Sequence, residues 1–178
     1  MKYLKNNKWS QISREERFFC SELYYELCHD LLPLLEALKI DVKNKSFDIG
    51  FEVCLYRDLL KFNDKRVSKM NFPQKRTFDL VIFSENELYI IEAKCQQGYK
   101  SSQLQSIKKE KELIMSLFKE IEHEKLITPI LISINSSKYN MSKEIQTVFD
   151  YIITWDNIAG IYKNRQEIFK RADGIYLN

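Results

Sequence analysis

The stretch FDLVIFSENELYIIEAK, residues 78–94, decides the fold of this chain. Two apolar runs, at 80–83 and 88–91, flank the polar cluster 84–87, as two strands flank a tight turn. Both faces of such a hairpin are apolar, which is typical of strands that are buried on both sides. We therefore predict a β-hairpin inside the core of the protein.

Three charged residues interrupt the apolar pattern at one end of this hairpin. A turn centred between Glu85 and Asn86 places Asp79 opposite Glu92, and Lys94 then lies on the same face as Glu92. Opposed side chains have Cβ atoms about 5 Å apart, where two like charges repel by roughly 3 kcal/mol. We therefore expect a positive group beside the two carboxylates.

The composition predicts one compact domain over residues 1–178. Of these residues 44% are hydrophobic and 13% aromatic, which is enough for a sizeable core. The net charge of +3 does not by itself indicate a nucleic-acid binder, but positive charge is concentrated at 61–76, where six basic residues stand against Asp64. A charge run of this kind is often only a solvated loop, yet this one leads directly into the hairpin.

Several classes of protein are disfavoured. The four cysteines lack CxxC spacing, and residues 1–11 lack the apolar core of a secretion signal. No apolar run approaches the length of about 20 residues that crosses a bilayer. We therefore expect a cytoplasmic protein with reduced thiols and no membrane role. The two histidines and the cysteines also lack the spacing of zinc ligands.

The remaining pattern predicts the order of elements. Ser13 and Glu16 form a capping-box pattern that opens a helix with an apolar stripe, and Pro33 ends or kinks that helix. A first strand is predicted at 47–56. A long amphipathic helix begins at Ser101 or Ser102, and a strand follows at 126–134, where Pro129 indicates an edge or a bulge. Beyond it we predict a helix at 142–149, a strand at 151–155 and a closing helix from Asp156 to Ala172.

This order predicts an α/β fold with a mixed central sheet and helices on both faces. The hairpin is antiparallel, whereas a strand, a long helix and another strand imply a right-handed parallel crossover. We expect an αβββαβ core at about residues 13–134 and a C-terminal α-β-α extension at about 135–178.

The charges at the hairpin end suit metal-assisted hydrolysis of a phosphodiester. Asp79 and Glu92 offer the hard oxygen ligands that Mg²⁺ prefers. The ammonium group of Lys94 could orient or help to deprotonate the attacking water and neutralise charge on the phosphate. A structural ion cluster or a solvated strand end is the simpler alternative, but two opposed carboxylates with one lysine would be costly if partly buried.

In these residues the sequence resembles the PD-(D/E)xK nuclease superfamily, which has the restriction-endonuclease-like fold. The resemblance rests on Asp79 and on Glu92-Ala93-Lys94, and it covers roughly residues 13–134; Phe78 stands at the position of the proline. It implies one or two divalent metal ions, Mg²⁺ with Mn²⁺ as a substitute. Asp79, Glu92 and the carbonyl of Ala93 would bind the metal, and Lys94 would serve the nucleophilic water.

Two further residues resemble functional positions of the superfamily. Glu16, in the string EERFF, is similar to the helix-borne glutamate that completes the metal site in Holliday-junction-resolvase-like members. Gln103 is similar to a glutamine that some members place after the lysine. Helix N-termini favour acidic and polar residues in any protein, so both residues also have a purely structural explanation, and Glu22 is the substitute for Glu16.

We therefore expect a metal-dependent endonuclease that acts on nucleic acid, in the first place DNA, with Lys75 and Arg76 contacting its backbone. The alternative is a catalytically inactive module of the same fold that binds nucleic acid or serves as a scaffold. A nucleotide-dependent enzyme is disfavoured, because the chain contains neither GxxxxGK[ST] nor GxGxxG. The sequence leaves open DNA or RNA, endo or exo cleavage, a homodimer, and the biological process.

Overall fold

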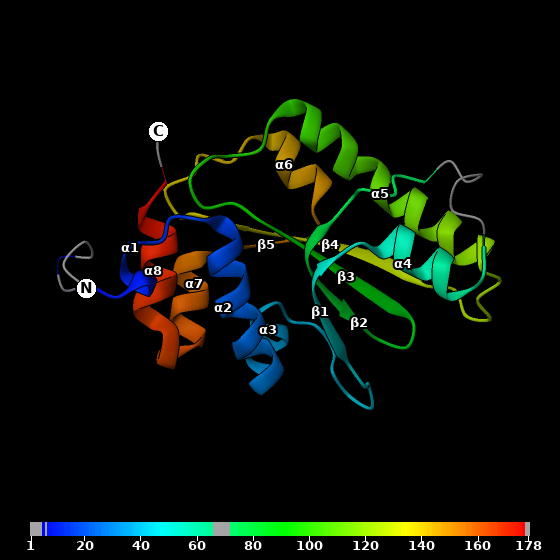
Figure 1. Cartoon of the computed structure of the whole chain (residues 1–178), viewed down its shortest axis with the longest axis horizontal. Coiled ribbons are helices and arrows are strands. Elements are labelled where there is room, and N and C mark those ends of the chain that lie inside the picture. Colours follow the sequence, from blue (N-terminus) through cyan, green and yellow to red (C-terminus); the bar gives the residue numbers. More distant parts are fainter. Residues whose placement is uncertain (1–4, 6, 66–71, 177–178) are drawn as a thin grey trace.

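A five-stranded mixed sheet runs through the computed structural model, which describes residues 5, 7–65 and 72–176 (Figure 1). Its strands lie in the order β1-β2-β3-β4-β5. The first three pair antiparallel, and β3, β4 and β5 pair parallel. The predicted α/β class, with a mixed sheet and flanking helices, is confirmed.

The described elements follow one another along the chain with these bounds: α1 (Trp9–Ile12), α2 (Glu16–His29), α3 (Leu32–Ala37), β1 (Asp48–Val53), α4 (Leu55–Phe62), β2 (Phe78–Phe83), β3 (Glu87–Ala93), α5 (Ser101–Glu120), β4 (Thr128–Asn135), α6 (Lys143–Val148), β5 (Tyr151–Thr154), α7 (Trp155–Ile161), the 3₁₀ turn η3 (Lys163–Arg165) and α8 (Gln166–Gly174).

The β2–β3 hairpin has the predicted register. Val81 pairs with Ile90 and Phe83 pairs with Leu88, so the turn is centred where the sequence placed it. The long helix α5 begins at Ser101 as predicted and connects β3 to the parallel strand β4. The hairpin therefore occupies the middle of the sheet, with β1 on one side and β4 on the other.

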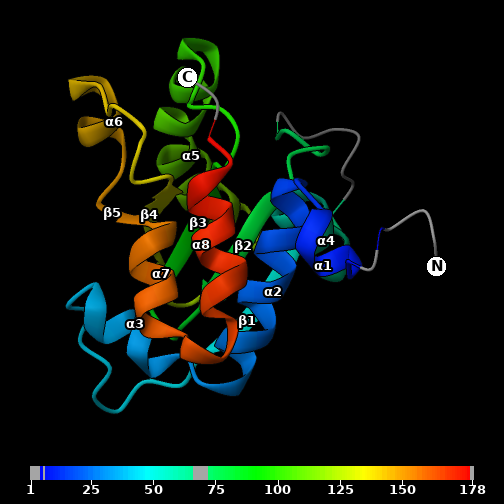
Figure 2. The same cartoon turned by 90° about the vertical axis from the view of Figure 1, so that its left-hand side faces the viewer.

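Helices cover both faces of the sheet and give it two separate cores (Figures 1 and 2). On one face Leu80, Ile82 and Tyr89 pack in a core with buried residues of α2, α3, α7 and α8. On the other face Val81 and Ile90 pack in a core with residues of α4, α5 and α6. This double burial explains why both faces of the hairpin are apolar in the sequence.

Several predicted boundaries are wrong at the N-terminal side. Helix α2 begins at Glu16 with Glu15 as its N-cap, and the Ser13 hydroxyl accepts only the N–H of Glu15 instead of capping the helix. Pro33 neither kinks nor ends α2, because α2 ends at His29 and the proline lies in the first turn of the separate helix α3, where its missing N–H is harmless.

The predicted strand at 47–56 is too long. It ends at Val53, and Leu55–Phe62 form helix α4. Leu55, Tyr56 and Leu60 are buried on one face of that helix. In the sequence, Leu55 continues the loose alternation of Phe51 and Val53, so the alternation alone predicts a longer strand.

Pro129 does not mark an edge strand or a bulge, because β4 lies between β3 and β5. The N–H of Thr128 donates toward β3, to the carbonyl of Asn86, so the backbone nitrogen of the next residue faces the other way. On that side β5 begins to pair only at Ile132. The proline therefore removes no hydrogen bond from the ladder.

The predicted single closing helix is two helices, α7 and α8, separated by η3. Thr154, not Asp156, is the N-cap of α7, and its hydroxyl accepts the N–H of Asn157. No helix within the described ranges is both long enough and apolar enough to cross a membrane.

Candidate active site

Asp79 lies on β2 at the end of the hairpin that is far from the turn, next to the last residues of β3. The register of the printed pairs, continued by one step, places Asp79 opposite Glu92, as the sequence predicted. The N–H of Ala93 donates to Oδ2 of Asp79 over 2.8 Å. In a strand the carbonyl of a residue points to the same side as its N–H, so the Ala93 carbonyl also faces Asp79. The aspartate and this carbonyl therefore share one side of β3.

Lys94 joins the hairpin to the start of α2. Its Nζ lies 2.8 Å from Oε1 of Glu16, and the N–H of Cys95 donates to Oε2 of the same glutamate over 3.1 Å. Helix α2 packs on the sheet through Phe19 and Leu23, which fixes its first residue at this position. Glu16 is therefore the helix-borne glutamate that reaches the hairpin end.

Arg76 supplies the positive group that the opposed carboxylates require. Its Nη2 lies 2.5 Å from Oε1 of Glu92, and its Nε lies 2.9 Å from Oε1 of Glu110. The guanidinium also lies over the ring of Phe78, 4.7 Å from the centroid. The expectation of a positive charge is thus met by Arg76, which the sequence had assigned only to nucleic-acid contact.

Glu110 is a residue of this site that sequence reasoning missed. It lies on α5 with only 2% of its surface exposed, and it accepts hydrogen bonds from Arg76 and from the hydroxyl of Tyr56. A signal for it exists in the sequence, because Glu110 falls on the apolar stripe of α5 between Ile107 and Ile114. A charge at such a position indicates a buried partner.

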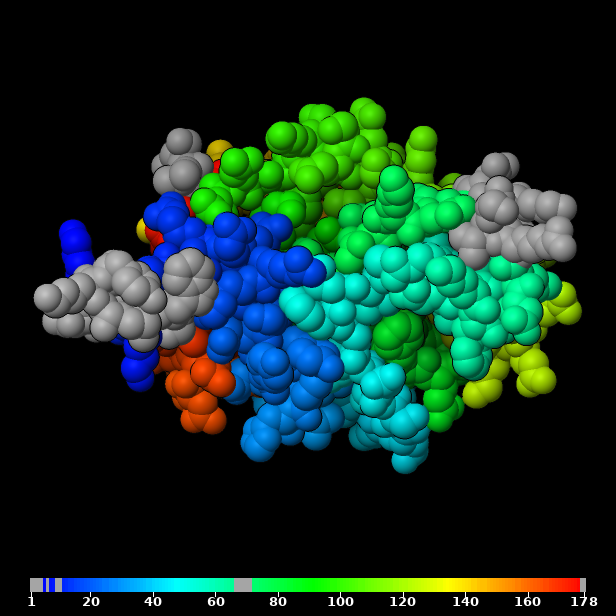
Figure 3. Space-filling view, viewed as in Figure 1, coloured from blue at the N-terminus to red at the C-terminus, as the bar shows by residue number. Residues whose placement is uncertain are grey.

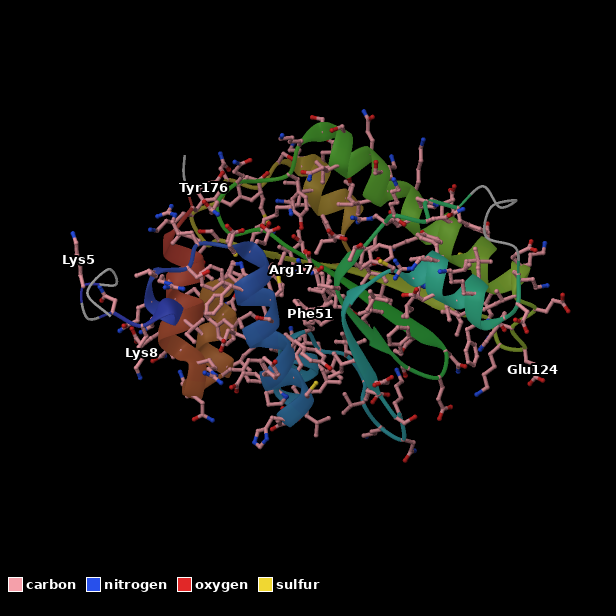
Figure 4. All side chains as sticks on the ribbon, viewed as in Figure 1. Lys5, Lys8, Arg17, Phe51, Glu124 and Tyr176 are labelled. Atoms are coloured by element: carbon pink, nitrogen blue, oxygen red, sulfur yellow. The ribbon has the colours of Figure 1, made fainter. Side chains whose placement is uncertain are left out.

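Glu52 of β1, which sequence reasoning did not single out, has an irregular backbone. The ladder between β1 and β2 includes the residues on both sides of Glu52 but not Glu52 itself, which has a left-handed φ of 54°. Its carboxylate pairs with Arg17 of α2 at 2.6 Å, and Figure 4 shows Arg17 beside Phe51 of β1. Backbone strain of this kind is often found beside functional sites.

Burial determines the direction of the pKa shift at the two glutamates Glu92 and Glu16. It raises the pKa of Glu92 to about 7; Arg76 acts against this rise, whereas Asp79 adds to it. Burial likewise raises the pKa of Glu16 in spite of the ion pair with Lys94. The pKa of Lys94 is also raised, because Glu16 and Asp79 outweigh the effect of its burial, so its ammonium form is favoured.

A cavity of about 300 Å³ opens over these groups and is lined by Arg76, Glu92, Lys94, Tyr99, Ser102, Gln103, Ser106 and Ile107. In the space-filling view α2, α4 and α5 meet on this face of the molecule (Figure 3). A larger cavity of about 510 Å³ at the far end of α5 contains none of the predicted site residues. The smaller cavity is lined by four of the predicted site residues, Arg76, Glu92, Lys94 and Gln103.

Gln103 lies at this cavity, and it also has the structural role that was its alternative explanation. Its Oε1 accepts the N–H of Lys100 over 3.0 Å and so helps to cap α5. Tyr99 holds the strand beside it, because its hydroxyl lies 3.0 Å from the carbonyl of Glu92 and 2.8 Å from the hydroxyl of Ser133. The loop between β3 and α5 is thereby fixed against the sheet.

The remaining predicted residues lie around the cluster. Lys75 is exposed next to Arg76. Glu22, the substitute for Glu16, lies away from Lys94 and pairs with Arg165 at 3.3 Å. Of the basic stretch 61–76, residues 66–71 lie outside the described part of the chain.

The donor set suits Mg²⁺ in number and charge. Within the described ranges no group of three or more histidine, cysteine or acidic side chains is placed to hold a metal ion. Mg²⁺, however, is often held by one or two carboxylates, with water and substrate phosphates completing its shell, and Asp79 and Glu92 supply that pair. Four carboxylates lie around Arg76 and Lys94 (Glu16, Asp79, Glu92 and Glu110), and when all four are ionised they exceed the two cations by two negative charges. A divalent cation would balance that excess and would favour the ionised forms of Glu16 and Glu92, whose pKa values burial raises.

No protein-family model matches the chain, and no curated protein matches it. The assignment of function therefore depends on the residues of this cluster and on their geometry.

Proposed function

We propose that this protein is a metal-dependent nuclease of the PD-(D/E)xK type that hydrolyses phosphodiester bonds in DNA. One observation carries the proposal: the antiparallel register brings Asp79 beside Glu92 and Ala93, and Lys94 of the same strand meets Glu16 of α2. These are the residue types that metal-assisted phosphodiester hydrolysis needs, held by the middle strands of the sheet.

Each side chain has its own role in this proposal. Asp79, Glu92 and the carbonyl of Ala93 would hold Mg²⁺ or Mn²⁺, with Glu16 as a further ligand or as the partner that orients Lys94. The bound ion would supply Lewis-acid stabilisation of the phosphate and a lowered pKa for water. Lys94, kept in its ammonium form by Glu16, would orient the water and stabilise charge that develops on the phosphate oxygens.

The substrate class follows from charge and access. The cavity over Glu92 and Lys94 is lined by polar groups of the first turns of α5, which can donate hydrogen bonds to phosphate oxygens. Lys75 is exposed on the segment that leads into β2, where a backbone phosphate can reach it. A cytoplasmic location agrees with four cysteines that are all free.

One observation favours the second candidate, a module of this fold that binds nucleic acid without cleaving it. Arg76 already lies 2.5 Å from Glu92, and Lys94 lies 2.8 Å from Glu16, so internal cations already contact two of the proposed metal ligands. A module of this kind would bind nucleic acid with little dependence on divalent ions.

A cleavage assay separates the two candidates. Purified protein is incubated with supercoiled plasmid, linear duplex, single-stranded DNA and RNA, each with Mg²⁺, Mn²⁺ or a chelator. We expect metal-dependent cleavage of at least one DNA form, and we expect its loss in Lys94→Ala. A matched control is Lys100→Ala, because Lys100 is an exposed lysine at the start of α5 that does not line the cavity.

The absence of cleavage of every DNA and RNA form, together with no binding of Mn²⁺ by calorimetry, would exclude the nuclease. Metal-independent binding of nucleic acid in the same experiment would then support the non-catalytic module.

A further inference from the structure

Arg76 is shared between two buried carboxylates, of which only Glu92 lines the cavity. Its Nη2 binds Glu92 at the cavity, and its Nε binds Glu110 in the interior at 2.9 Å. One guanidinium carries one positive charge, so it neutralises only one of the two carboxylates. Glu92 is accordingly left with a partial counter-charge.

Glu110 holds the other side of the guanidinium in place. Its side chain is 3% exposed, and it receives a second hydrogen bond from Tyr56, whose ring stacks on Phe72 at 15° between the ring planes. The ring of Phe78 supports the guanidinium from below. Removing Glu92 from Arg76 would therefore leave the arginine still paired, oriented and packed.

This asymmetry makes the contact with Glu92 exchangeable. Breaking a buried ion pair is usually expensive because it leaves an uncompensated charge. Here Glu110 still balances the charge of Arg76 when Glu92 leaves, so only Glu92 loses its counter-charge. A bound cation would then balance the charge of Glu92. Arg76 lines the cavity together with Ser102, Gln103 and Ser106. A phosphate oxygen is the acceptor that a guanidinium favours there.

We propose that Arg76 is an exchangeable counter-ion, which releases Glu92 to a divalent metal ion and takes a phosphate oxygen of the nucleic acid in its place. Glu110 and Tyr56 are positioning residues that hold the guanidinium during this exchange. The inference rests on the proposed function, and it adds that metal binding and nucleic-acid binding at this site support each other through one arginine.

The first experiment measures binding of Mn²⁺ alone by calorimetry at pH 8, in the absence of nucleic acid. In Arg76→Met the metal no longer competes with the guanidinium for Glu92, so we expect its affinity to rise by about tenfold or more. In Glu110→Gln the arginine depends on Glu92 alone, so we expect the affinity for Mn²⁺ to fall by about tenfold. In the double variant no guanidinium remains for Glu110 to hold, so the affinity should stay at the raised value of Arg76→Met, whereas a return to the wild-type value would indicate only a sum of independent charges.

Two matched controls separate exchange from the general field of the charges. Lys109→Met removes one positive charge from an exposed position of α5 next to Glu110, and Glu112→Gln removes one negative charge from another exposed position of the same helix. Both should leave the affinity for Mn²⁺ within about twofold, because the field of exposed charges is screened. If Arg76→Met and Glu110→Gln change the affinity no more than these controls, or in the same direction, the exchange is refuted.

The second experiment tests the phosphate. In a Lys94→Met background, which suppresses cleavage, a fluorescent DNA oligonucleotide is titrated with and without Mn²⁺. We expect Mn²⁺ to strengthen binding and Arg76→Met to remove most of that gain, because linkage between two ligands is reciprocal. A gain that persists unchanged in Arg76→Met refutes the phosphate contact.

Folding and function can be told apart in this design. Circular dichroism verifies each variant, and Tyr56→Phe, which removes one hydrogen bond to Glu110 and keeps the ring, replaces Glu110→Gln if the latter does not fold. Like Glu110→Gln, Tyr56→Phe should lower the affinity for Mn²⁺, but by a smaller factor. A rise in affinity would refute the positioning role of Glu110 and Tyr56. Wild-type protein that binds no Mn²⁺ and cleaves nothing refutes the proposed function itself, whereas normal metal binding without opposite shifts refutes only the exchange.

Discussion

The two ends of strand β3 each carry a glutamate that is paired with a cation, and the two pairs behave in opposite ways. At the turn end Glu87 lies 2.6 Å from Lys45, and at the site end Glu92 lies 2.5 Å from Arg76. Burial acts to raise the pKa of Glu87, but hydrogen bonds from Lys45 and Tyr89 outweigh it and lower the pKa overall. At Glu92 burial prevails, and its pKa rises to about 7.

The difference follows from exposure, since the side chain of Glu87 is 27% exposed and that of Glu92 only 8%. The ion pair with Lys45 outweighs the desolvation of Glu87 at the turn end. The ion pair of similar length with Arg76 does not outweigh the desolvation of Glu92 at the site end. A buried carboxylate with a strongly raised pKa is typical of functional sites, where the residue is retained for its chemistry and not for its contribution to stability. The matched pair Glu87 and Glu92 therefore offers a direct way to test the functional assignment.

The largest expected effect is on cleavage. Glu92→Gln removes a proposed metal ligand, so we expect the rate of DNA cleavage to fall by about a thousandfold, which corresponds to about 4 kcal/mol of transition-state stabilisation. Glu87→Gln changes the same residue type on the same strand and should keep the rate within about twofold. If both variants lost cleavage activity equally, Glu92 would act through the stability of the fold and not as a metal ligand.

The second prediction concerns stability against pH in a chelating buffer. The folded-state pKa of Glu92 is raised from 4.5 to about 7, so folding disfavours its ionised form, and the free energy of unfolding falls as pH rises from about 4.5 to 7. This loss is at most about 3 kcal/mol. Glu92→Gln should remove it, which a series of urea denaturation curves can measure.

Glu87 should act with the opposite sign. Its folded-state pKa is lowered, so its contribution to stability is present above the unfolded pKa of 4.5 and is lost as pH falls below that value. Glu87→Gln should therefore reduce stability at neutral pH and have little effect in acid. Parallel pH profiles for the two variants would contradict the contrast between the strand ends.

The third prediction concerns stabilisation by metal. A ligand that binds only the folded state at ten times its dissociation constant adds about 1.4 kcal/mol, which raises the melting temperature of a chain of this size by about 4 °C. We expect this rise with Mg²⁺ for the wild type and Glu87→Gln, and its absence in Glu92→Gln. Differential scanning fluorimetry with a chelator as the blank is sufficient. A rise in all three proteins would place the metal elsewhere.

The smallest expected effect concerns Gln103, which both caps α5 and lines the cavity. Gln103→Ala should destabilise the protein by about 1 kcal/mol through loss of the cap. Gln103→Glu keeps the acceptor for the cap, so its stability should stay close to that of the wild type while cleavage falls about threefold. Unchanged cleavage in Gln103→Glu would assign this residue to the cap alone.

The hairpin and the position of Asp79 opposite Glu92 could be predicted from the sequence, because a hairpin is governed by local rules. Period-two alternation and a polar turn determine which residues face each other, so the opposition of Asp79 and Glu92 followed from counting. The order of the main strands and the start of α5 followed in the same way. The double burial of the hairpin was readable because both of its faces are apolar.

The remainder depends on contacts between distant segments, which no local pattern encodes. Glu110 lies far along the chain from Arg76, and only the packing of α5 on the sheet brings the two together. The sequence does not predict helix α4, because Leu55 continues the period-two alternation of Phe51 and Val53. Pro129 was misread because a proline removes nothing from a ladder when its nitrogen faces a side where no strand pairs.

The central claim is that the site end of β3 holds a catalytic metal ion, and Mn²⁺-soaked crystals test it most directly through anomalous scattering. The account predicts a peak about 2 Å from carboxylate oxygens of both Asp79 and Glu92. It further predicts that Arg76 has left Glu92 and remains on Glu110, with Glu16 and not Glu22 beside the ion. Absence of a peak at the hairpin end, with Arg76 still bound to Glu92 in crystals that carry Mn²⁺ elsewhere, would contradict it.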